Sequence, residues 1–168
     1  MDKNVILAKK YGRAIYEIAA EQNSLEKTEE ELHLIADAIK EHADLKELLF
    51  HPLLAKDVKK DTIKKLFADK VQPVVLQFCY VVIDRDRITD FPAMVDVYTT
   101  LAHHGMGIEE AVVTSALPMT KSQVEALKAK LSESTGKKIL MKQKVDTALI
   151  GGFTVQVGDR LIDGSVAR

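Results

Sequence analysis

The apolar residues of this sequence change their spacing at residues 105–107, where Gly-Met-Gly separates two patterns. Before this point, apolar side chains recur every three or four residues, as on one face of an α-helix. After it, they alternate with polar residues, as in half-buried β-strands. The sequence therefore predicts an α+β fold with two domains, a helical one at residues 1–105 and a small α+β one at residues 106–168.

The first half contains six stretches with helical spacing, joined by short connections, and this predicts an antiparallel six-helix bundle. The expected helices cover residues 3–22, 25–39, 44–50, 57–67, 74–85 and 90–105. Asp44 and Asp57 are predicted to cap the third and fourth helices, because a carboxylate can accept the free backbone N–H groups of a first turn. Pro73 suits the first turn of the fifth helix.

The second half is predicted to form four strands and one helix. The strands are expected at residues 108–116, 137–145, 153–157 and 160–163, with Gly158-Asp159 as a two-residue hairpin turn. Thr120 and Gln123 have the spacing of a capping box, which predicts a helix from there to Gly136. Residues 164–168 have the pattern of a turn and the first turn of another helix.

Charge and composition exclude several classes of function. The chain has 168 residues with 24 basic and 25 acidic side chains. Residues 1–105 hold 15 Lys and Arg against 18 Asp and Glu, a net of −3, which argues against nucleic-acid binding. No apolar stretch is long enough to span a bilayer. The single cysteine, Cys79, excludes an internal disulfide, and a reducing cytoplasmic compartment fits it.

No motif predicts catalysis, a cofactor or a metal site. The glycine pairs are not followed by the residues of a phosphate loop. His103-His104 is interpreted as an ordinary helix end, and Asp84-Arg85-Asp86-Arg87 as a solvated helix end with ion pairs. Cys79 is expected to be a buried thiol. Because catalytic groups can assemble from distant segments, a small enzyme that uses Asp146, Asp159 and Asp163 stays open as an alternative, with a binding protein as the default.

The positive signal is an excess of apolar residues on two expected helices. The fifth reads PVVLQFCYVVID and is apolar in nearly every direction, and the first carries two neighbouring apolar stripes around Gly12. A helix that is apolar all round must be buried all round. The excess fits either the bundle core or a groove that receives an amphipathic helix from a partner.

Several segments, in order along the whole chain, resemble the delta subunit family of F-type ATP synthases, the bacterial equivalent of the mitochondrial oligomycin-sensitivity-conferring protein. The resemblance lies in AKKYGRAIY at residues 8–16, HPLL at residues 51–54, DRDRI at residues 84–88 and VTSA at residues 113–116. Its most specific part is ILMKQKVDTALIGGFTVQVG at residues 139–158, with Gly151, Gly152, Gly158 and then Gly164 as structural glycines. Asp86 stands where the family commonly has glycine, and the family's last helix would lie beyond Arg168.

The resemblance implies a non-catalytic stator connector in a proton-driven ATP synthase, without cofactor or metal. It places the protein at the cytoplasmic face of the cell membrane, as a peripheral subunit that reaches the membrane only through the complex. The bundle would bind the amphipathic N-terminal helix of an alpha subunit, and the second domain would bind the b subunits of the peripheral stalk. The residues expected to line the alpha-binding groove are Tyr11, Ala14, Ile15, Ile18, Phe78, Val81 and Val82, with core positions as the alternative for some of them. The competing interpretation is an RNA-binding or transcription-factor-like helical adaptor.

Overall fold

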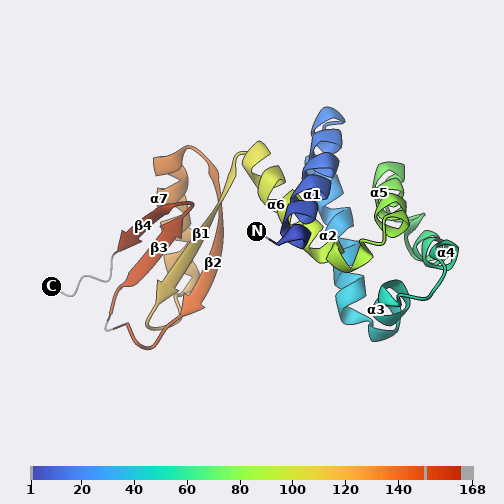
Figure 1. Ribbon diagram of the computed structural model, residues 1–168. Coiled ribbons are helices and arrows are strands. Elements are labelled where there is room, and N and C mark those ends of the chain that lie inside the picture. Colours follow the sequence, from blue (N-terminus) through green and yellow to red (C-terminus); the bar gives the residue numbers. More distant parts are fainter. Residues whose placement is uncertain (1, 150, 164–168) are drawn as a thin grey trace. The chain divides into compact units, whose positions relative to one another are not determined.

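The computed structural model describes residues 2–149 and 151–163, and the chain divides into two compact units, residues 1–102 and 103–168. The division falls in the last turn of the helix Phe91–Gly105, just before the predicted boundary. The first unit is helical and the second combines a sheet with a helix, so the predicted α+β class is confirmed (Figure 1).

The first unit contains a helix in each stretch with helical spacing. The helices are α1 (Lys3–Glu21), α2 (Leu25–Glu41), α3 (Ala43–Phe50), α4 (Lys56–Phe67), α5 (Pro73–Asp84) and most of α6 (Phe91–Gly105), with a 3-10 turn η1 (Ile88–Asp90) before α6. The fully buried side chains of this unit include Ile15, Leu32, Ile35, Ile63, Val75, Phe91, Met94 and Tyr98. These residues come from α1, α2, α4, α5 and α6, so one apolar core joins most of the helices.

Two of the predicted helix caps are wrong. His42 ends α2 and is also the N-cap of α3, so Asp44 lies inside the first turn. Ala55 is the N-cap of α4, which places Asp57 inside the first turn as well. Both helices therefore begin earlier than the carboxylates suggested. The negative charges still favour these helix ends, because the first turn carries the positive end of the helix dipole.

The second unit is a four-stranded sheet with one helix packed against it (Figure 1). Its elements are β1 (Ile108–Ser115), α7 (Lys121–Thr135), β2 (Lys138–Val145), β3 (Phe153–Val157) and β4 (Arg160–Asp163), in the sheet order β2-β1-β3-β4. β1 and β2 are parallel and α7 connects them, whereas β3 and β4 are antiparallel to their neighbours. The core between sheet and helix consists of Ala111, Val113, Leu131, Ile139, Val155 and Val157.

The predicted capping box and hairpin turn of the second unit are confirmed. Thr120 and Gln123 form the capping box of α7, and Gly136 ends that helix in the left-handed conformation at φ +69°. Val157 pairs with Arg160, which leaves Gly158 and Asp159 as the two residues of the β3–β4 loop. Gly158 has φ +57°, a value that glycine adopts without strain. The predictions for Gly164 and for a helical turn at residues 165–168 lie outside the described residues.

Candidate partner-binding site

Helix α1 presents a different apolar stripe to the core and to the surface. Its buried residues are Ala8, Gly12, Ile15 and Ala19. The neighbouring stripe comprises the half-buried Leu7 and Tyr11, the exposed Ala14, and Ile18, which is 40% exposed. Both stripes have the i, i+4, i+7, i+11 spacing of one helix face. The second stripe is therefore apolar surface that the first unit leaves open.

Gly12 lies in a close contact between α1 and α6. A Cβ atom added at Gly12 would lie 2.7 Å from the Cβ and Cγ1 atoms of Val97 and 2.8 Å from the backbone oxygen of Met94. The close neighbour that a glycine in the middle of a helix suggests is thus α6 of the same chain. Tyr16 also contacts α6, since its ring centroid is 6.5 Å from that of Tyr98.

Helix α5 is likewise apolar on two sides. Its buried residues are Val75, Cys79, Val82 and Ile83. A second line at i, i+4, i+7 spacing contains the half-buried Val74 and Phe78, and Val81, which is 39% exposed. The ring of Phe78 packs against the buried Phe91, with 6.2 Å between the ring centroids. Phe78 is therefore anchored in the core while part of its ring reaches the surface.

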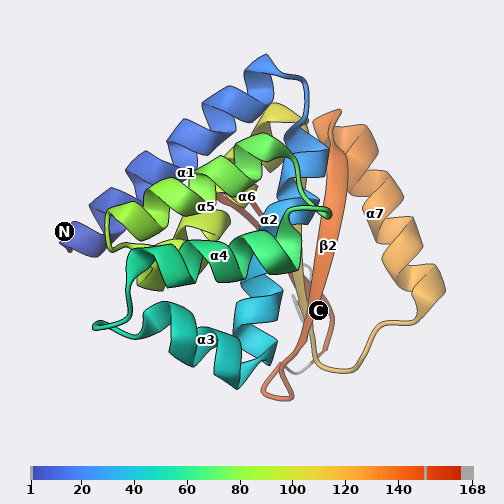
Figure 2. The ribbon, with the colours of Figure 1, turned by 90° about the vertical axis from the view of Figure 1, so that its right-hand side faces the viewer.

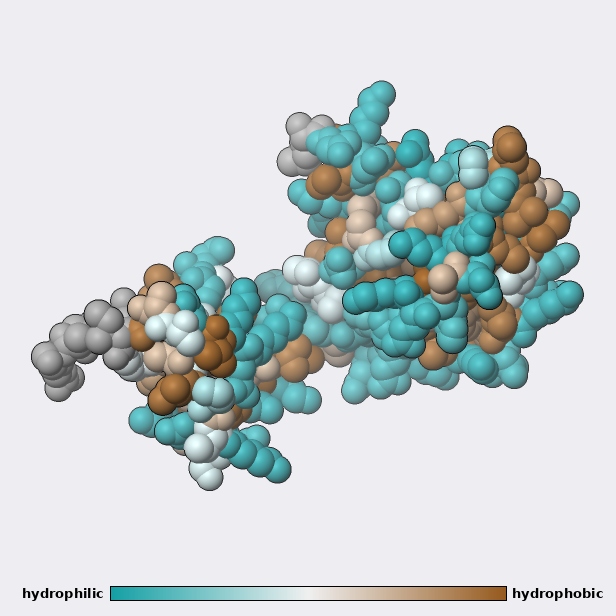
Figure 3. Space-filling model, turned by 90° about the horizontal axis from the view of Figure 1, so that it is seen from below, coloured by the Kyte–Doolittle hydropathy of each residue, from teal (hydrophilic) through white to brown (hydrophobic). Residues whose placement is uncertain are grey.

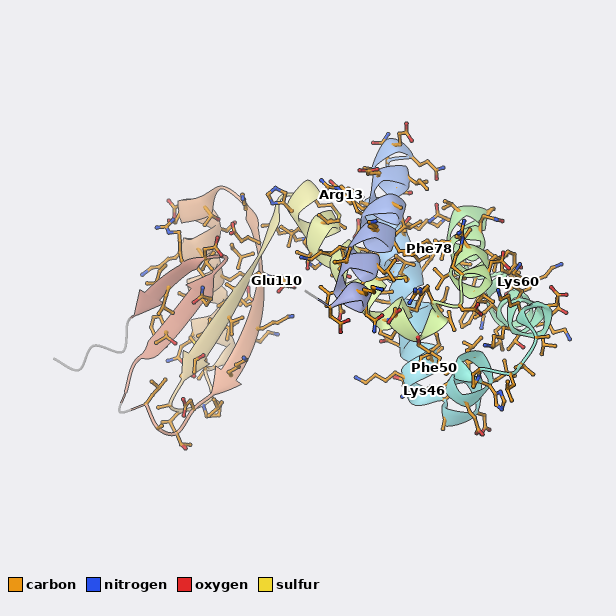
Figure 4. All side chains as sticks on the ribbon, viewed as in Figure 1. Arg13, Lys46, Phe50, Lys60, Phe78 and Glu110 are labelled. Atoms are coloured by element: carbon orange, nitrogen blue, oxygen red, sulfur yellow. The ribbon has the colours of Figure 1, made fainter. Side chains whose placement is uncertain are left out.

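The open stripes of α1 and α5 lie on neighbouring helices. From α1 to α5 to α4, the three helices follow one another across the first unit in both ribbon views (Figures 1 and 2). Figure 4 shows Phe78 on the side of α5 toward α1 and α2, and Lys60 of α4 on the opposite side. Leu7, Tyr11, Ala14 and Ile18 of α1 and Val74, Phe78 and Val81 of α5 form the apolar surface at which a partner-binding groove is expected, and we call this surface the α1–α5 groove.

The seven residues expected to line a groove separate into two groups. Five reach the surface in the α1–α5 groove: Tyr11, Ala14, Ile18, Phe78 and Val81. Ile15 and Val82 do not, because they are 1% and 0% exposed and belong to the core. On an amphipathic helix, adjacent residues such as Ala14 and Ile15 point about 100° apart, so one can be exposed while the next is buried.

Sequence reasoning omitted two residues that the structure adds to this surface. Leu7 and Val74 extend the stripes by one helical turn toward the N-termini of α1 and α5. The spacing alone was a sufficient signal, since Leu7 lies four residues before Tyr11 and Val74 four residues before Phe78.

Polar contacts fix both ends of α5. At its start, the buried Glu31 of α2 accepts hydrogen bonds of 3.0 Å from the backbone N and the side-chain Nε2 of Gln72. At its end, Lys56 of α4 donates to the backbone oxygen of Asp84 at 2.7 Å and pairs with Asp86 at 3.2 Å. An anion at the N-terminus and a cation at the C-terminus both suit the helix dipole. Nothing in the sequence paired residues 31 and 72, which lie far apart along the chain.

The acidic residues at the end of α5 pair with lysines of α4. Asp84 also pairs with Lys60 of α4, so lysines of α4 supply the partners for both acids of this segment. Asp86 adopts the left-handed conformation at φ +55°, and its carboxylate reaches Lys56. An aspartate tolerates this conformation better than most residues, because its short polar side chain can hydrogen-bond locally.

The residues considered for catalysis or metal binding lie in environments that are typical of structural residues. Cys79 is buried, as predicted, and burial raises the pKa of its thiol from the ordinary value of 9.0 to about 12, so it carries no thiolate at neutral pH. His103 is buried, with its Nδ1 3.7 Å from a carboxylate oxygen of Glu110. Within residues 2–149 and 151–163, no three His, Cys, Asp or Glu side chains gather as metal ligands would. No helix in the same described part is both long and apolar enough to cross a membrane.

Apolar exposure alone does not single out the α1–α5 groove. Leu53 and Leu117 are 88% and 77% exposed, and the face seen in Figure 3 has apolar patches among hydrophilic residues on both units. In the second unit, a cleft of about 680 Å³ lies between α7 and the start of β3, lined among others by Met119, Leu127 and Phe153. What distinguishes the α1–α5 groove is that its apolar residues form two continuous stripes on neighbouring helices, the geometry that receives a third helix.

Comparisons with known proteins agree in sequence and in fold. The family described as ATP synthase delta (OSCP) subunit matches residues 7–168. The ATP synthase subunit delta of Alkaliphilus metalliredigens is 37% identical over 161 residues, covering 96% of this chain and 89% of that protein. The protein of the same name from Brevibacillus brevis is 34% identical over 163 residues, covering 95% and 91%. A chain of the Toxoplasma gondii mitochondrial ATP synthase hexamer has the same fold, with a TM-score of 0.71 at 17% identity over 95% of this chain and 91% of that one.

These matches define a non-catalytic connector subunit rather than an enzyme. The competing interpretation, an RNA-binding or transcription-factor-like adaptor, has no support. The chain belongs to the ATP synthase delta (OSCP) subunit family, as its sequence resemblance implied. It is thus a subunit of the F-type ATP synthase that contributes to the stator and performs no chemistry of its own.

Proposed function

We propose that the α1–α5 groove binds the amphipathic N-terminal helix of the ATP synthase alpha subunit. The observation that carries this proposal is the pair of open apolar stripes on α1 and α5, with Ala14 exposed at the middle of one stripe. A small residue at this position lets a third helix approach closely, while Tyr11, Ile18 and Phe78 flank the contact. Helix-in-groove binding of this kind buries apolar side chains at i, i+3, i+4 and i+7 of the incoming helix.

The stator role demands a contact that stays formed under torque. Affinity differences between related complexes lie mainly in the dissociation rate, and buried apolar anchors are what lower that rate. The polar contacts at both ends of α5 hold one wall of the groove in place before the partner arrives. A preformed wall lowers the entropy lost on binding. In this proposal α1 to α6 act together as one antiparallel six-helix bundle, residues 1–105, that grips the catalytic head.

The second domain expected from the sequence, residues 106–168, is proposed to bind the b subunits of the peripheral stalk. Its cleft between α7 and β3 offers apolar side chains beside the exposed Leu117, which suits an amphipathic partner. Linking head and stalk through two units would keep the head from turning with the rotor. The proposed location follows from these contacts: the cytoplasmic face of the cell membrane, as a peripheral part of the complex.

Calorimetric titration with a synthetic peptide of the alpha subunit's N-terminal helix tests the groove. Binding with a negative heat-capacity change is expected, because apolar surface leaves water. Ala14→Asp should abolish binding and leave the melting temperature within a few degrees, since Ala14 is exposed. Ala129→Asp is the matched control, an exposed alanine in the middle of α7, and should bind normally. Unchanged binding by Ala14→Asp would place the partner elsewhere.

A further inference from the structure

The charged residues of α1 are separated by sign along the helix. From its start to Arg13, every charged residue is basic, namely Lys3, Lys9, Lys10 and Arg13. The remaining two, Glu17 and Glu21, are both acidic. All six side chains belong to exposed residues. One end of α1 therefore presents positive charge to solvent and the other end negative charge.

This order opposes the preferences of an isolated helix. Asp2, the N-cap just before α1, places one carboxylate where the dipole favours it and accepts a hydrogen bond from the backbone N of Asn4 at 3.2 Å. Within α1, however, the first turn has Lys3 and no acidic residue, and the last turn has Glu21 and no basic residue, whereas the dipole favours the reverse. Arg13 pairs with Glu17 at 3.6 Å, and at i, i+4 spacing the basic residue comes first, which is the weaker of the two orders. Local stability does not explain the arrangement. Places where a sequence departs from such local rules are expected at functional sites.

The charges border the α1–α5 groove. Lys10 lies three residues after Leu7 and four before Ala14, so it neighbours both on the helix surface, and Glu17 lies three residues after Ala14. Lys3, Lys10 and Glu17 follow one another at seven-residue spacing and form one line beside the stripe. The stripe of α5 from Val74 to Val81 contains no charged residue, and Asp84, the last residue of α5, pairs with Lys60 of α4. The polarity of the groove is thus set by α1.

We infer that this charge order fixes the direction in which the partner helix lies, with the partner parallel to α1. The occupant is an amphipathic helix with acidic residues in its first half and basic residues in its second half. In the parallel orientation its acids meet Lys3 and Lys10 while its bases meet Glu17 and Glu21. An ordinary helix carries this polarity, since acids favour its N-terminus and bases its C-terminus. The inference rests on the proposed function and adds the orientation and chemistry of the bound helix.

The length of the stripe bounds the length of this helix. Leu7 to Ile18 covers about 17 Å at about 1.5 Å per residue, so the contact segment comprises roughly three helical turns. At the same rise Lys3 and Glu21 lie about 27 Å apart, more than the Debye length of about 10 Å at 0.1 M salt, whereas Arg13 and Glu17 in the middle pair with each other at 3.6 Å. Each half of the partner is therefore affected by one sign of charge.

Two synthetic peptides of identical composition test the inference. Both are 18-residue amphipathic helices with the same apolar stripe; one has its acids in the first two turns and its bases in the last two, and the other has the reverse order. At low salt each peptide should bind with its acids beside Lys3 and Lys10, so that the acid-first peptide lies parallel to α1 and the reversed peptide antiparallel. This preference for one direction should shrink at 1 M salt, because the charges are screened. The double variant Lys10→Glu with Glu17→Lys should reverse the preference.

A control and a structural readout complete the experiment. The double variant Lys27→Glu with Glu30→Lys makes the same exchange at exposed positions of α2 and should keep the wild-type preference. A nitroxide at the N-terminus of the acid-first peptide should broaden the amide resonances near Lys3 and Leu7. The same label on the reversed peptide should broaden the resonances near Glu21. Broadening near Glu21 by the acid-first peptide, or near Lys3 by both peptides, would overturn the orientation while leaving the groove intact. Absence of binding by either peptide would overturn the groove itself, and the orientation with it.

Discussion

The crossing of α1 and α6 at Gly12 allows a quantitative prediction for Gly12→Ala. In an unconstrained helix this substitution stabilises by about 1 kcal/mol, because alanine loses less backbone freedom on folding. Here the new methyl group would lie 2.7 Å from two carbon atoms of Val97 and 2.8 Å from the backbone oxygen of Met94. A rotamer change of Val97 cannot relieve the contact with the backbone. Overpacking of this kind costs typically about 1–3 kcal/mol, occasionally more, so we expect a net destabilisation of about 1–2 kcal/mol.

Urea unfolding followed by circular dichroism measures this effect as a shift of the midpoint at unchanged slope. The double variant Gly12→Ala with Val97→Ala should recover only part of the loss relative to Val97→Ala alone, since the oxygen of Met94 remains in place. Gly151→Ala is the control, because an added Cβ there would meet no described atom within 4 Å and the φ angle is not positive. A Gly12→Ala protein as stable as the wild type, or more stable, would refute the reasoning that the two helices cross in contact at this residue.

Three further predictions concern α5 and its surroundings. Asp86→Ala should be less stable than Asp86→Gly by about 1 kcal/mol in urea unfolding, because only glycine removes the left-handed strain while both variants lose the exposed pair with Lys56. Glu31→Ala should cost about 1–3 kcal/mol, because it leaves the donors of Gln72 without their acceptor; a loss below half a kcal/mol would contradict this role. Burial raises the pKa of the Cys79 thiol above its value in the unfolded chain. The contribution of Cys79 to the free energy of unfolding is therefore fully present below pH 9 and declines by about 1.4 kcal/mol per pH unit toward pH 12. The Cys79→Ala variant should lack this part of the alkaline decline in chemical denaturation.

The elements of this protein were predictable because local periodicity and turn chemistry determine them. The change of spacing at residues 105–107 separates helices from strands, and the capping box at Thr120 marks the start of α7. The helix starts at Asp44 and Asp57 were wrong because α3 and α4 begin after His42 and Ala55, neither of which caps its helix with a side-chain hydrogen bond. The local sequence pattern does not show at which residue the preceding helix or loop ends.

The candidate site was only partly predictable, because periodicity shows that a helix has two apolar stripes but not which one faces the core. Ile15 and Val82 were assigned to the groove, yet both are buried, while Leu7 and Val74 were omitted. The deciding contacts are tertiary: Gly12 against α6 and Phe78 against Phe91 set the rotation of α1 and α5. The link from Glu31 to Gln72 joins residues distant in sequence and could not be read from local spacing.

The most direct test of the α1–α5 groove is a nuclear magnetic resonance titration of the full chain with the alpha subunit's N-terminal peptide. The largest amide shift changes are expected on the two stripes, at Ala14, Ile18, Phe78 and Val81, and they should saturate together with the calorimetric signal. Largest changes instead at the recess beside Lys46 and Phe50, or at the cleft of the second unit, would contradict the assignment of α1 and α5 as the site that holds the catalytic head.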